Sequence, residues 1–184
     1  AADDRAQISR MAEAVWAHPA AAVLLHWEGK AETTHMWTDP ATGLACKCRP
    51  DWLTNDGRLI VDLKTTEDAS PAGFRKSIGA FRYHVQSSWY LDGVQAATGN
   101  RPEQFLFVCV EKKPPYAVAV YAAAPVIVTI GAETAARDLD VLATCKQAGA
   151  WPGYSDQIEP ISLPGWMMPR PDGSMQQPPE IETY

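Results

Sequence analysis

Residues 45–66 read ACKCRPDWLTNDGRLIVDLKTT, in which an Asn-Asp-Gly step at 55–57 separates two strand-like runs, 45–53 and 58–64. The second run is rich in Leu, Ile and Val, which favour strands. An Asp-Gly step between two such runs is among the strongest sequence signals for a β-hairpin. The stretch therefore predicts an antiparallel strand pair.

The register of this pair brings two carboxylates together. A two-residue turn at Asp56-Gly57 places Asp51 directly opposite Asp62, and facing carboxylates repel each other. A divalent cation between them removes that cost, because Mg²⁺ is commonly held by one or two carboxylates and by phosphate oxygens. Lys64 points to the same sheet face as Asp62. We therefore predict a phosphodiester-cleaving centre.

A simpler interpretation exists for each carboxylate. Asp51 could begin a turn after Pro50, and Asp62 could be a charge at a sheet edge. The second alternative is weaker, because Asp62 stands inside the apolar run LIVDL and an unpaired buried carboxylate is costly. The sequence therefore favours a functional role for Asp62.

The Pro50-Asp51 and Asp62-x-Lys64 pattern resembles the signature of the PD-(D/E)xK nuclease superfamily, whose members cut DNA with Mg²⁺. The surrounding sequence narrows the resemblance to the RecE-like group, the exonuclease VIII type of prophage and phage exonucleases. This similarity extends from about residue 7 to residue 166. The stretches that carry it are CKCRPD at 46–51, VDLKTT at 61–66, YHVQ at 83–86 and QSSWY at 86–90.

The resemblance implies a metal-dependent exonuclease that digests double-stranded DNA from its ends in the 5′→3′ direction. Its single-stranded product would serve recombination through a single-strand annealing partner, and the enzyme would form a ring-shaped homo-oligomer. Mg²⁺ is the implied cofactor, with Mn²⁺ as a substitute. Two alternatives stay open: another nuclease of the superfamily, either an endonuclease or a single-strand exonuclease, and a catalytically impaired DNA-binding module of the same fold.

The resemblance also assigns roles to further residues. It implies that the Leu63 backbone carbonyl joins Asp51 and Asp62 as a metal ligand. Gln86 and Tyr90, four residues apart and therefore on one helix face, match a Gln-x-x-x-Tyr motif that lines the active site of such nucleases. Glu32 is either a further metal ligand or an exposed residue. The residues expected to bind DNA are Arg49, Thr65, Thr66, Arg75, Lys76, Arg82 and His84.

One departure from the RecE-like pattern concerns a histidine. Enzymes of this group present a metal-binding histidine from a Gly-x-x-x-His helix upstream of the Pro-Asp step. No such motif precedes Glu28 here, and the chain begins at Ala1 without methionine. We therefore expect that an N-terminal part is missing or that this ligand is absent, and that the stretch alone cuts poorly.

Composition fits this interpretation without requiring it. The chain has 184 residues, 46% of them hydrophobic, which is enough for one domain with a real core. We expect that domain at 1–168 and a flexible, proline-rich tail at 169–184. The absence of an apolar run of ~20 residues and of a signal peptide predicts a cytoplasmic protein of a bacterial host cell, with no membrane partner. A net charge of −6 argues against coating DNA by bulk electrostatics.

The four cysteines are Cys46, Cys48, Cys109 and Cys145. They are scattered and stand mostly in apolar runs. A zinc finger would need a second closely spaced pair, and an iron–sulfur cluster would need four clustered thiolates. We therefore expect reduced thiols in the core.

The remaining pattern predicts an α/β fold, with a mixed central β-sheet flanked by helices. The interruption at His18-Pro19 ends a first helix, because the residue before proline avoids helical geometry. Ser70-Pro71 begins another helix. The expected helices are 4–17, a short one ending near 25, 70–98 with a break at Gly79, and about 126–148; the expected strands are 31–38, 45–53, 58–64, 105–110, 116–122 and a short one at 159–163.

Overall fold

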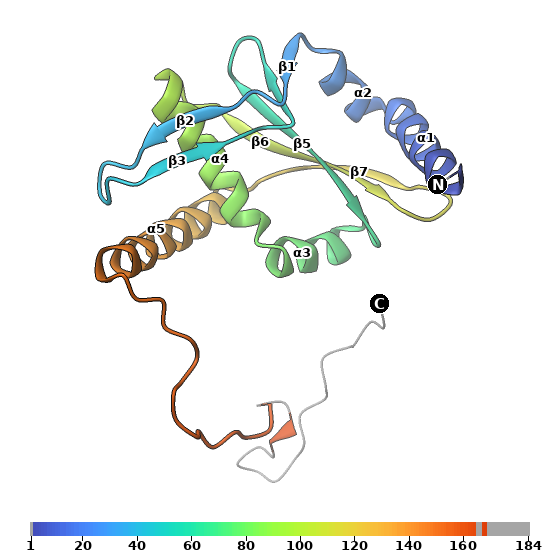
Figure 1. Ribbon diagram of the computed structural model, residues 1–184. Coiled ribbons are helices and arrows are strands. Elements are labelled where there is room, and N and C mark those ends of the chain that lie inside the picture. Colours follow the sequence, from blue (N-terminus) through green and yellow to red (C-terminus); the bar gives the residue numbers. More distant parts are fainter. Residues whose placement is uncertain (1, 165–166, 169–184) are drawn as a thin grey trace.

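The computed structural model describes residues 2–164 and 167–168 of the chain. Within these residues, a mixed five-stranded sheet in the order β1-β4-β5-β6-β7 has helices on both faces (Figure 1). The predicted α/β class is therefore confirmed. The strands of this sheet are β1 (Gly29–Ala31), β4 (Trp52–Thr54), β5 (Leu59–Thr66), β6 (Gln104–Glu111) and β7 (Val118–Ala122). The helices are α1 (Ala2–Ala17), α2 (Pro19–His26), α3 (Pro71–Ala80), α4 (Tyr83–Thr98) and α5 (Pro125–Ala148).

The centre of the sheet is formed by β5 and β6, which are parallel. The chain passes from β5 to β6 through α3 and α4, and a parallel pair requires such a crossover. The pairs β1–β4, β4–β5 and β6–β7 are antiparallel. Residues 60–62 and 105–110 are all buried, as expected for strands that helices cover on both faces.

Alternate residues of the central strands face two separate cores. The core on the α3–α4 side contains Ile60, Phe74, Leu91, Phe105 and Phe107. The core on the α1–α2 side contains Val15, Ala21, Val61, Leu106 and Val108. Because Ile60 faces α4 and Val61 faces α1–α2, the next residue, Asp62, must point toward α4.

The predicted register of the β4–β5 hairpin is confirmed. Trp52 pairs with Val61, so the preceding residue, Asp51, lies opposite Asp62. Asp51 comes directly before β4, and Asp62 stands in the middle of β5. The hairpin thus brings together two carboxylates that are separated by its whole loop in the sequence.

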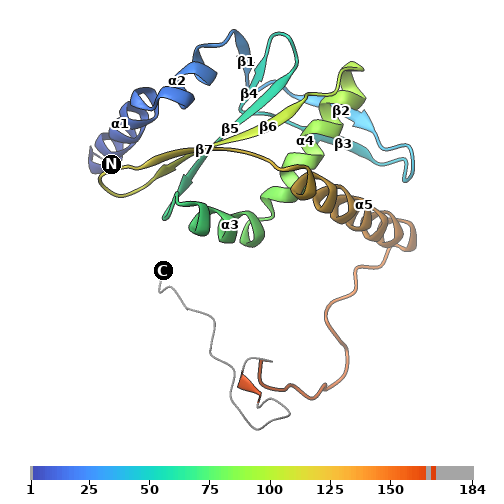
Figure 2. The same cartoon turned by 180° about the vertical axis from the view of Figure 1, so that it is seen from behind.

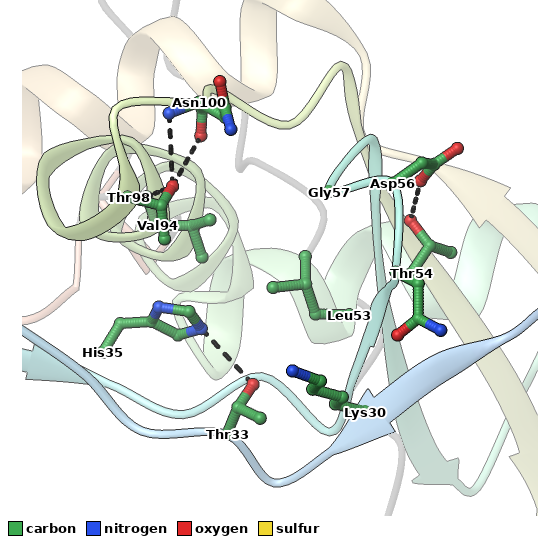
Figure 3. Close-up of a pocket in the computed structure, with 11 residues that line it drawn as sticks. Lys30, Thr33, His35, Leu53, Thr54, Asp56, Gly57, Val94, Thr98 and Asn100 are labelled. Carbon is green, nitrogen blue, oxygen red and sulfur yellow. Dashed lines mark hydrogen bonds between the residues drawn. The ribbon is translucent and has the colours of Figure 1, made fainter.

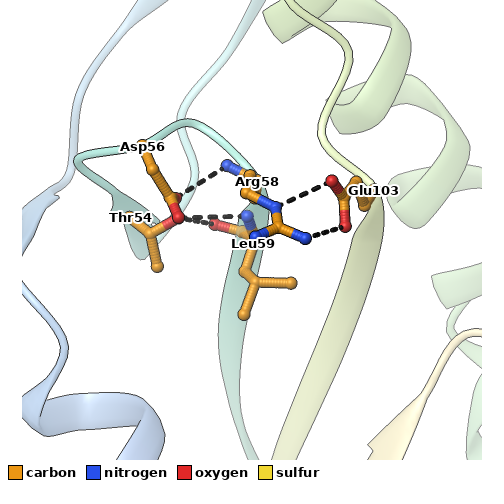
Figure 4. Close-up of polar contacts among 5 residues, drawn as sticks. All are labelled: Thr54, Asp56, Arg58, Leu59 and Glu103. Carbon is orange, nitrogen blue, oxygen red and sulfur yellow. Dashed lines mark hydrogen bonds and ion pairs between the residues drawn. The ribbon is translucent and has the colours of Figure 1, made fainter.

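The predicted two-residue turn at Asp56-Gly57 is wrong, because the loop of the hairpin is longer. Gly57 has a φ of 71°, Asp56 has no positive φ, and the Gly57 N–H donates to the Thr54 carbonyl at 2.8 Å. The Thr54 hydroxyl donates to Asp56 Oδ1 at 2.6 Å and accepts from the Leu59 N–H at 3.0 Å (Figure 4). These side-chain bonds replace ladder bonds at the hairpin end, and they preserve the register despite the longer loop.

The strands predicted at 31–38 and 45–53 are wrong as single strands. The structure divides each run between the central sheet and a separate two-stranded sheet, formed by β2 (His35–Thr38) and β3 (Ala45–Cys48). Pro50 lies at the break in the second run, where it has no N–H to donate to a ladder. The segments that form β2 and β3 therefore leave the central sheet together and pair with each other.

The break in the first run places Asp51 at the margin of the central sheet. Glu32 has a φ of 55°, an uncommon conformation that turns the chain. Its N–H donates to the Asp51 carbonyl at 3.2 Å, at the point where the two runs separate. The Asp51 side chain is consequently half-buried rather than enclosed by a continuous sheet.

The outer β2–β3 sheet packs against α4. The rings of Trp37 on β2 and Trp89 on α4 have centroids 4.9 Å apart, and Trp89 Nε1 donates to the Lys47 carbonyl at 3.0 Å. Gly93 allows this close approach, because a Cβ there would lie 2.6 Å from the Trp37 ring. The outer sheet therefore fixes α4 over the face to which Asp62 points.

The helix predicted over 70–98 is two helices. Gly79 lies inside α3, so the break expected there is wrong; the chain instead turns at Arg82, whose φ is 58°. Helix α5 packs against α4 where the two helices meet (Figure 2), and a Cβ at Gly131 would lie 2.0 Å from the His84 carbonyl oxygen. Helix α4 is thus packed between the sheet and α5.

Residues 149–164, which follow α5, run away from the sheet and helices (Figure 1). The strand predicted at 159–163 is wrong, because those residues are exposed and form no regular structure. The tail predicted at 169–184 lies outside the described residues, and the single domain at 1–168 stays a prediction. Among the described residues, no helix has both the length and the apolarity needed to cross a membrane.

Candidate active site

Asp62 is a fully buried carboxylate in the middle of β5. Its Oδ1 accepts a hydrogen bond from Gln86 Nε2 at 2.7 Å, and its Oδ2 lies 2.5 Å from Lys64 Nζ. The Oδ2 contact is a close ion pair, and within the described residues Oδ2 has no further hydrogen-bond partner. A metal ion bound at this carboxylate would therefore share Oδ2 with the Lys64 ammonium.

Burial is the main reason why the pKa of the Asp62 carboxyl is raised to about 6. The charge and the hydrogen bond of Lys64 lower this pKa, the charge of Asp51 raises it and the hydrogen bond from Gln86 lowers it. The two acids thus lie close enough to repel each other. A strongly perturbed carboxyl with a charged partner is typical of a functional site.

Asp51 is held in place by the backbone of the opposite strand. Its Oδ2 accepts from the Leu63 N–H at 2.9 Å, directly beside Asp62. The Leu63 side chain is half exposed. The hairpin register thus brings Asp51, Asp62 and the Leu63 backbone into one small region.

Lys64 lies between the buried carboxylate and an aromatic ring. Its Nζ lies 4.5 Å from the centroid of the Tyr83 ring, and its side chain is 15% exposed. A cation over an aromatic face is stabilised electrostatically. Asp62 and Tyr83 together therefore hold the ammonium in a defined position at the site. The sequence assigns no role to Tyr83, yet this residue precedes Gln86 by three positions and shares its helix face.

Gln86 and Tyr90 lie one helical turn apart on the same face of α4, and both face the carboxylates. Burial is the largest cause of the raised pKa of the Tyr90 phenol; its hydrogen bond with Gln86 acts in the opposite direction. The charges of Asp62 and Asp51 raise this pKa further, which places the phenol within their electrostatic reach. The Tyr90 ring packs against Phe105, with centroids 6.1 Å apart.

Glu32 does not join these acids through its side chain. Its carboxylate pairs with Arg49 Nε at 2.8 Å, and only its backbone contacts Asp51. Across residues 2–164 and 167–168, no three His, Cys, Asp or Glu side chains cluster closely enough to hold a metal ion. A metal at this site would depend on Asp51, Asp62 and main-chain or substrate oxygens. Such hard oxygen donors fit Mg²⁺ or Mn²⁺.

The cysteines offer no alternative metal site. Cys46, Cys48 and Cys109 are buried free thiols, and Cys145 is a partly exposed one. Burial raises the pKa of Cys48 to about 11 and that of Cys109 to about 12. The predicted position of the thiols, mostly in the core, is confirmed.

Several residues expected to bind DNA are engaged within the fold. Thr66 is buried, and its hydroxyl donates to the Asp68 carbonyl at 3.2 Å. Arg82 pairs with Asp138 on α5. His84 Nδ1 contacts the Ile78 carbonyl of α3 at 3.3 Å. The contacts of Arg82 and His84 were not visible from the sequence, because their partners lie on other helices.

The other expected DNA-binding residues line cavities. Arg49 and Tyr90 border a cavity of about 350 Å³, and Thr65 and Lys76 border one of about 380 Å³. Arg75 lies apart from both, in a cavity of about 210 Å³ with Phe74 and Tyr121 among its lining residues. Arg49, Thr65 and Lys76 are therefore the better placed to meet a substrate.

A larger cavity of about 570 Å³ lies away from the acids. It is bounded by the hairpin loop, by His35 of β2 and by the C-terminal part of α4, with Lys30 at its side (Figure 3). Its polar contacts are local, such as the 3.3 Å contact between Thr33 Oγ1 and His35 Nε2. Asp51 and Asp62 do not line it, so its size does not make it the candidate site.

A mixed sheet whose central hairpin carries Pro-Asp and Asp-x-Lys, with a helix covering the acids, has the fold and motif of PD-(D/E)xK nucleases. The family model described as PDDEXK-like domain of unknown function (DUF3799) matches residues 2–164. The chain belongs to this family, and the predicted superfamily resemblance is confirmed.

The chain is similar to solved structures at low sequence identity, and the first of them shares its fold. A crystal structure of a candidate exonuclease from Eubacterium rectale matches with a TM-score of 0.66 and 15% identity, over 85% of this chain and 62% of that one. This chain thus spans about three fifths of that protein. An alkaline exonuclease from Laribacter hongkongensis matches with a TM-score of 0.37 and 13% identity, over 71% and 66% of the respective chains. No curated protein matches the sequence.

Proposed function

We propose that this chain hydrolyses phosphodiester bonds of DNA with a divalent metal ion. The observation that carries the proposal is the fully buried Asp62, which faces Asp51 across the hairpin. A fold gains nothing in stability from a buried carboxylate beside a second acid. A cation bound between the two acids would offset both the burial and the repulsion.

Asp51, Asp62 and the Leu63 carbonyl are the groups that would hold Mg²⁺, with Mn²⁺ as a substitute. When bound, such an ion polarises the scissile phosphate and lowers the pKa of an attacking water. Gln86 holds Asp62 in position through the 2.7 Å hydrogen bond to Oδ1, and the ion would share Oδ2 with Lys64. Tyr90 closes the same side of the site.

Lys64 supplies a fixed positive charge at the reacting phosphate. Its ammonium is already oriented by Asp62 and Tyr83, so little reorganisation is needed during the reaction. A preorganised donor of this kind stabilises negative charge that develops on phosphate oxygens. In this proposal Lys64 also positions the attacking water, and its loss would abolish turnover without loss of the fold.

The finer substrate assignment follows from the RecE-like resemblance. We propose exonuclease action on double-stranded DNA ends in the 5′→3′ direction, which yields single strands for an annealing partner in the bacterial cytoplasm. A ring-shaped homo-oligomer would retain the DNA between cuts. Contacts through phosphates carry no base information, so cleavage is expected to depend little on sequence.

Digestion of defined DNA substrates tests this proposal. Linear duplexes labelled at one 5′ or one 3′ end should release short labelled products only from the 5′ label, and only with Mg²⁺ or Mn²⁺. Closed circular duplex should stay intact, whereas its cleavage would indicate an endonuclease. Lys64→Ala should be inactive, and Lys30→Ala, an exposed lysine in the distant cavity, serves as its matched control. A metal-supplemented protein that cuts no substrate would overturn the proposal.

A further inference from the structure

A cavity of about 380 Å³ opens beside Lys64, between the end of β5 and the α3–α4 junction. Its volume falls within the range of small-molecule sites. Tyr83, the ring that contacts Lys64, forms part of its wall, and Phe81 forms another part. The cavity thus adjoins the candidate active site through a shared side chain, although none of the proposed metal ligands lines it.

Phe81 presents its ring at this cavity in a fixed position. The side chain is 64% exposed, and its ring stacks on Tyr83 with a centroid distance of 5.6 Å and an interplanar angle of 29°. The Phe81 N–H donates to the Ser77 carbonyl at 2.9 Å, and the next residue, Arg82, is anchored to Asp138 on α5. The ring is therefore exposed, and both its backbone and the following residue are anchored.

A chain of contacts joins this exposed ring to the buried acid. Phe81 stacks on Tyr83, the Tyr83 face carries Lys64 Nζ at 4.5 Å, and Nζ pairs with Asp62. A phosphate held at Lys64 would consequently place its attached nucleoside near the two rings. Phe81 thus differs from other exposed aromatic residues in its connection, through Tyr83, to Lys64 and Asp62.

The charges around this cavity are already balanced. Glu67 pairs with Lys112 at 3.2 Å and with Lys113 at 3.4 Å. Asp68 accepts from the Ser70 N–H at 2.7 Å and interacts with Lys76. A cavity with an aromatic wall and paired charges suits a planar, uncharged group better than a phosphate.

We propose that Phe81 and Tyr83 form a stacking platform for a nucleobase next to the scissile phosphate. This inference rests on the proposed function, because it takes DNA as the substrate. The platform accepts any base, since every base offers a π-face, and it orders the strand end while Lys64 holds the phosphate. Phe81 is thereby a substrate-binding residue.

Cleavage of DNA with and without terminal bases tests the platform. Phe81→Ala should lower kcat/KM on a normal duplex by about 5- to 150-fold, the range that loss of one base–aromatic stack represents. On a duplex with abasic residues at the two terminal nucleotides of the cleaved strand, the same variant should match the wild type. Phe81→Trp should keep most of the activity, and Trp151→Ala, similarly exposed at 65%, serves as control.

A purely structural role of Phe81 predicts a different result. If the ring only supports Tyr83 and Lys64, Phe81→Ala loses the same factor on normal and abasic DNA, and the platform is overturned. Because Phe81 is mostly exposed, the alanine variant should fold normally, and circular dichroism checks this.

A binding measurement in EDTA separates the platform from the hydrolysis. DNA with 2-aminopurine at the strand end should lose fluorescence on binding the wild type, and much less on binding Phe81→Ala. Quenching in EDTA together with no cleavage when Mg²⁺ or Mn²⁺ is supplied would support the platform and refute the nuclease proposal. Cleavage without Phe81-dependent quenching would refute the platform and leave the nuclease proposal standing.

Discussion

Replacement of the buried carboxylate by its neutral isostere, Asp62→Asn, should stabilise the metal-free protein. Asp62 is fully buried, and its pKa is raised from the ordinary 3.8 to about 6. The difference of about two pKa units corresponds to a cost of about 3 kcal/mol for the ionised carboxyl in the folded protein at pH 8, since each pKa unit is about 1.36 kcal/mol. This figure is the upper limit of the gain.

Part of that gain is offset by the neighbours of Asp62. The asparagine Oδ1 can still accept the hydrogen bond from Gln86, but Lys64 loses its anionic partner while its side chain is only 15% exposed. Breaking a buried ion pair is costly, so we expect a net gain of about 1–2 kcal/mol. For a chain of this size, that raises Tm by about 2–8 °C.

The pH dependence identifies the source of the gain. Because the folded-state pKa of Asp62 is raised, the native protein binds more protons than the unfolded chain between about pH 4 and pH 6, so wild-type stability falls as pH rises through this window. The advantage of Asp62→Asn should therefore be full above pH 7 and should shrink as pH falls toward 4.

Thermal unfolding in EDTA at several pH values measures this effect, with Asp140→Asn on the exposed face of α5 as control. Added Mg²⁺ should raise the Tm of the wild type and leave that of Asp62→Asn nearly unchanged. A lower Tm for Asp62→Asn at pH 8 would show that the ion pair with Lys64 outweighs burial and repulsion. A gain that does not vary with pH would refute the ionisation argument.

Three further predictions concern the elements around the site. Tyr90→Phe keeps the ring packing and removes the hydroxyl, so the cleavage rate should fall while Tm changes little; an unchanged rate would return Tyr90 to a packing role. Gly93→Ala should lower the free energy of unfolding by about 1–3 kcal/mol in urea titrations, because the added methyl meets Trp37; wild-type stability would show that α4 can shift. Thr54→Val removes both hydroxyl bonds of the hairpin loop and should cost about 1–3 kcal/mol, whereas the exposed Thr38→Val should not.

The sequence by itself determined the hairpin and its acids. The Asn-Asp-Gly step between two strand-like runs predicted the register, and the register set Asp51 opposite Asp62 even though the turn type was wrong. Strand alternation placed Lys64 on the face of Asp62, and helical spacing placed Tyr90 with Gln86. These results were accessible because each depends on residues that are close together in the chain.

Only the tertiary structure decided how the site is enclosed. The break of both strands near Pro50 depends on the outer sheet. The junction at Arg82 depends on its contact with α5, and the stacking of Phe81 depends on the Tyr83 ring at the start of α4. The same holds for Arg82 and His84, whose polar groups bond to other helices instead of pointing freely at DNA. Sequence periodicity shows which residues share a face of one element, but the partner of that face is chosen by packing between elements distant in the chain.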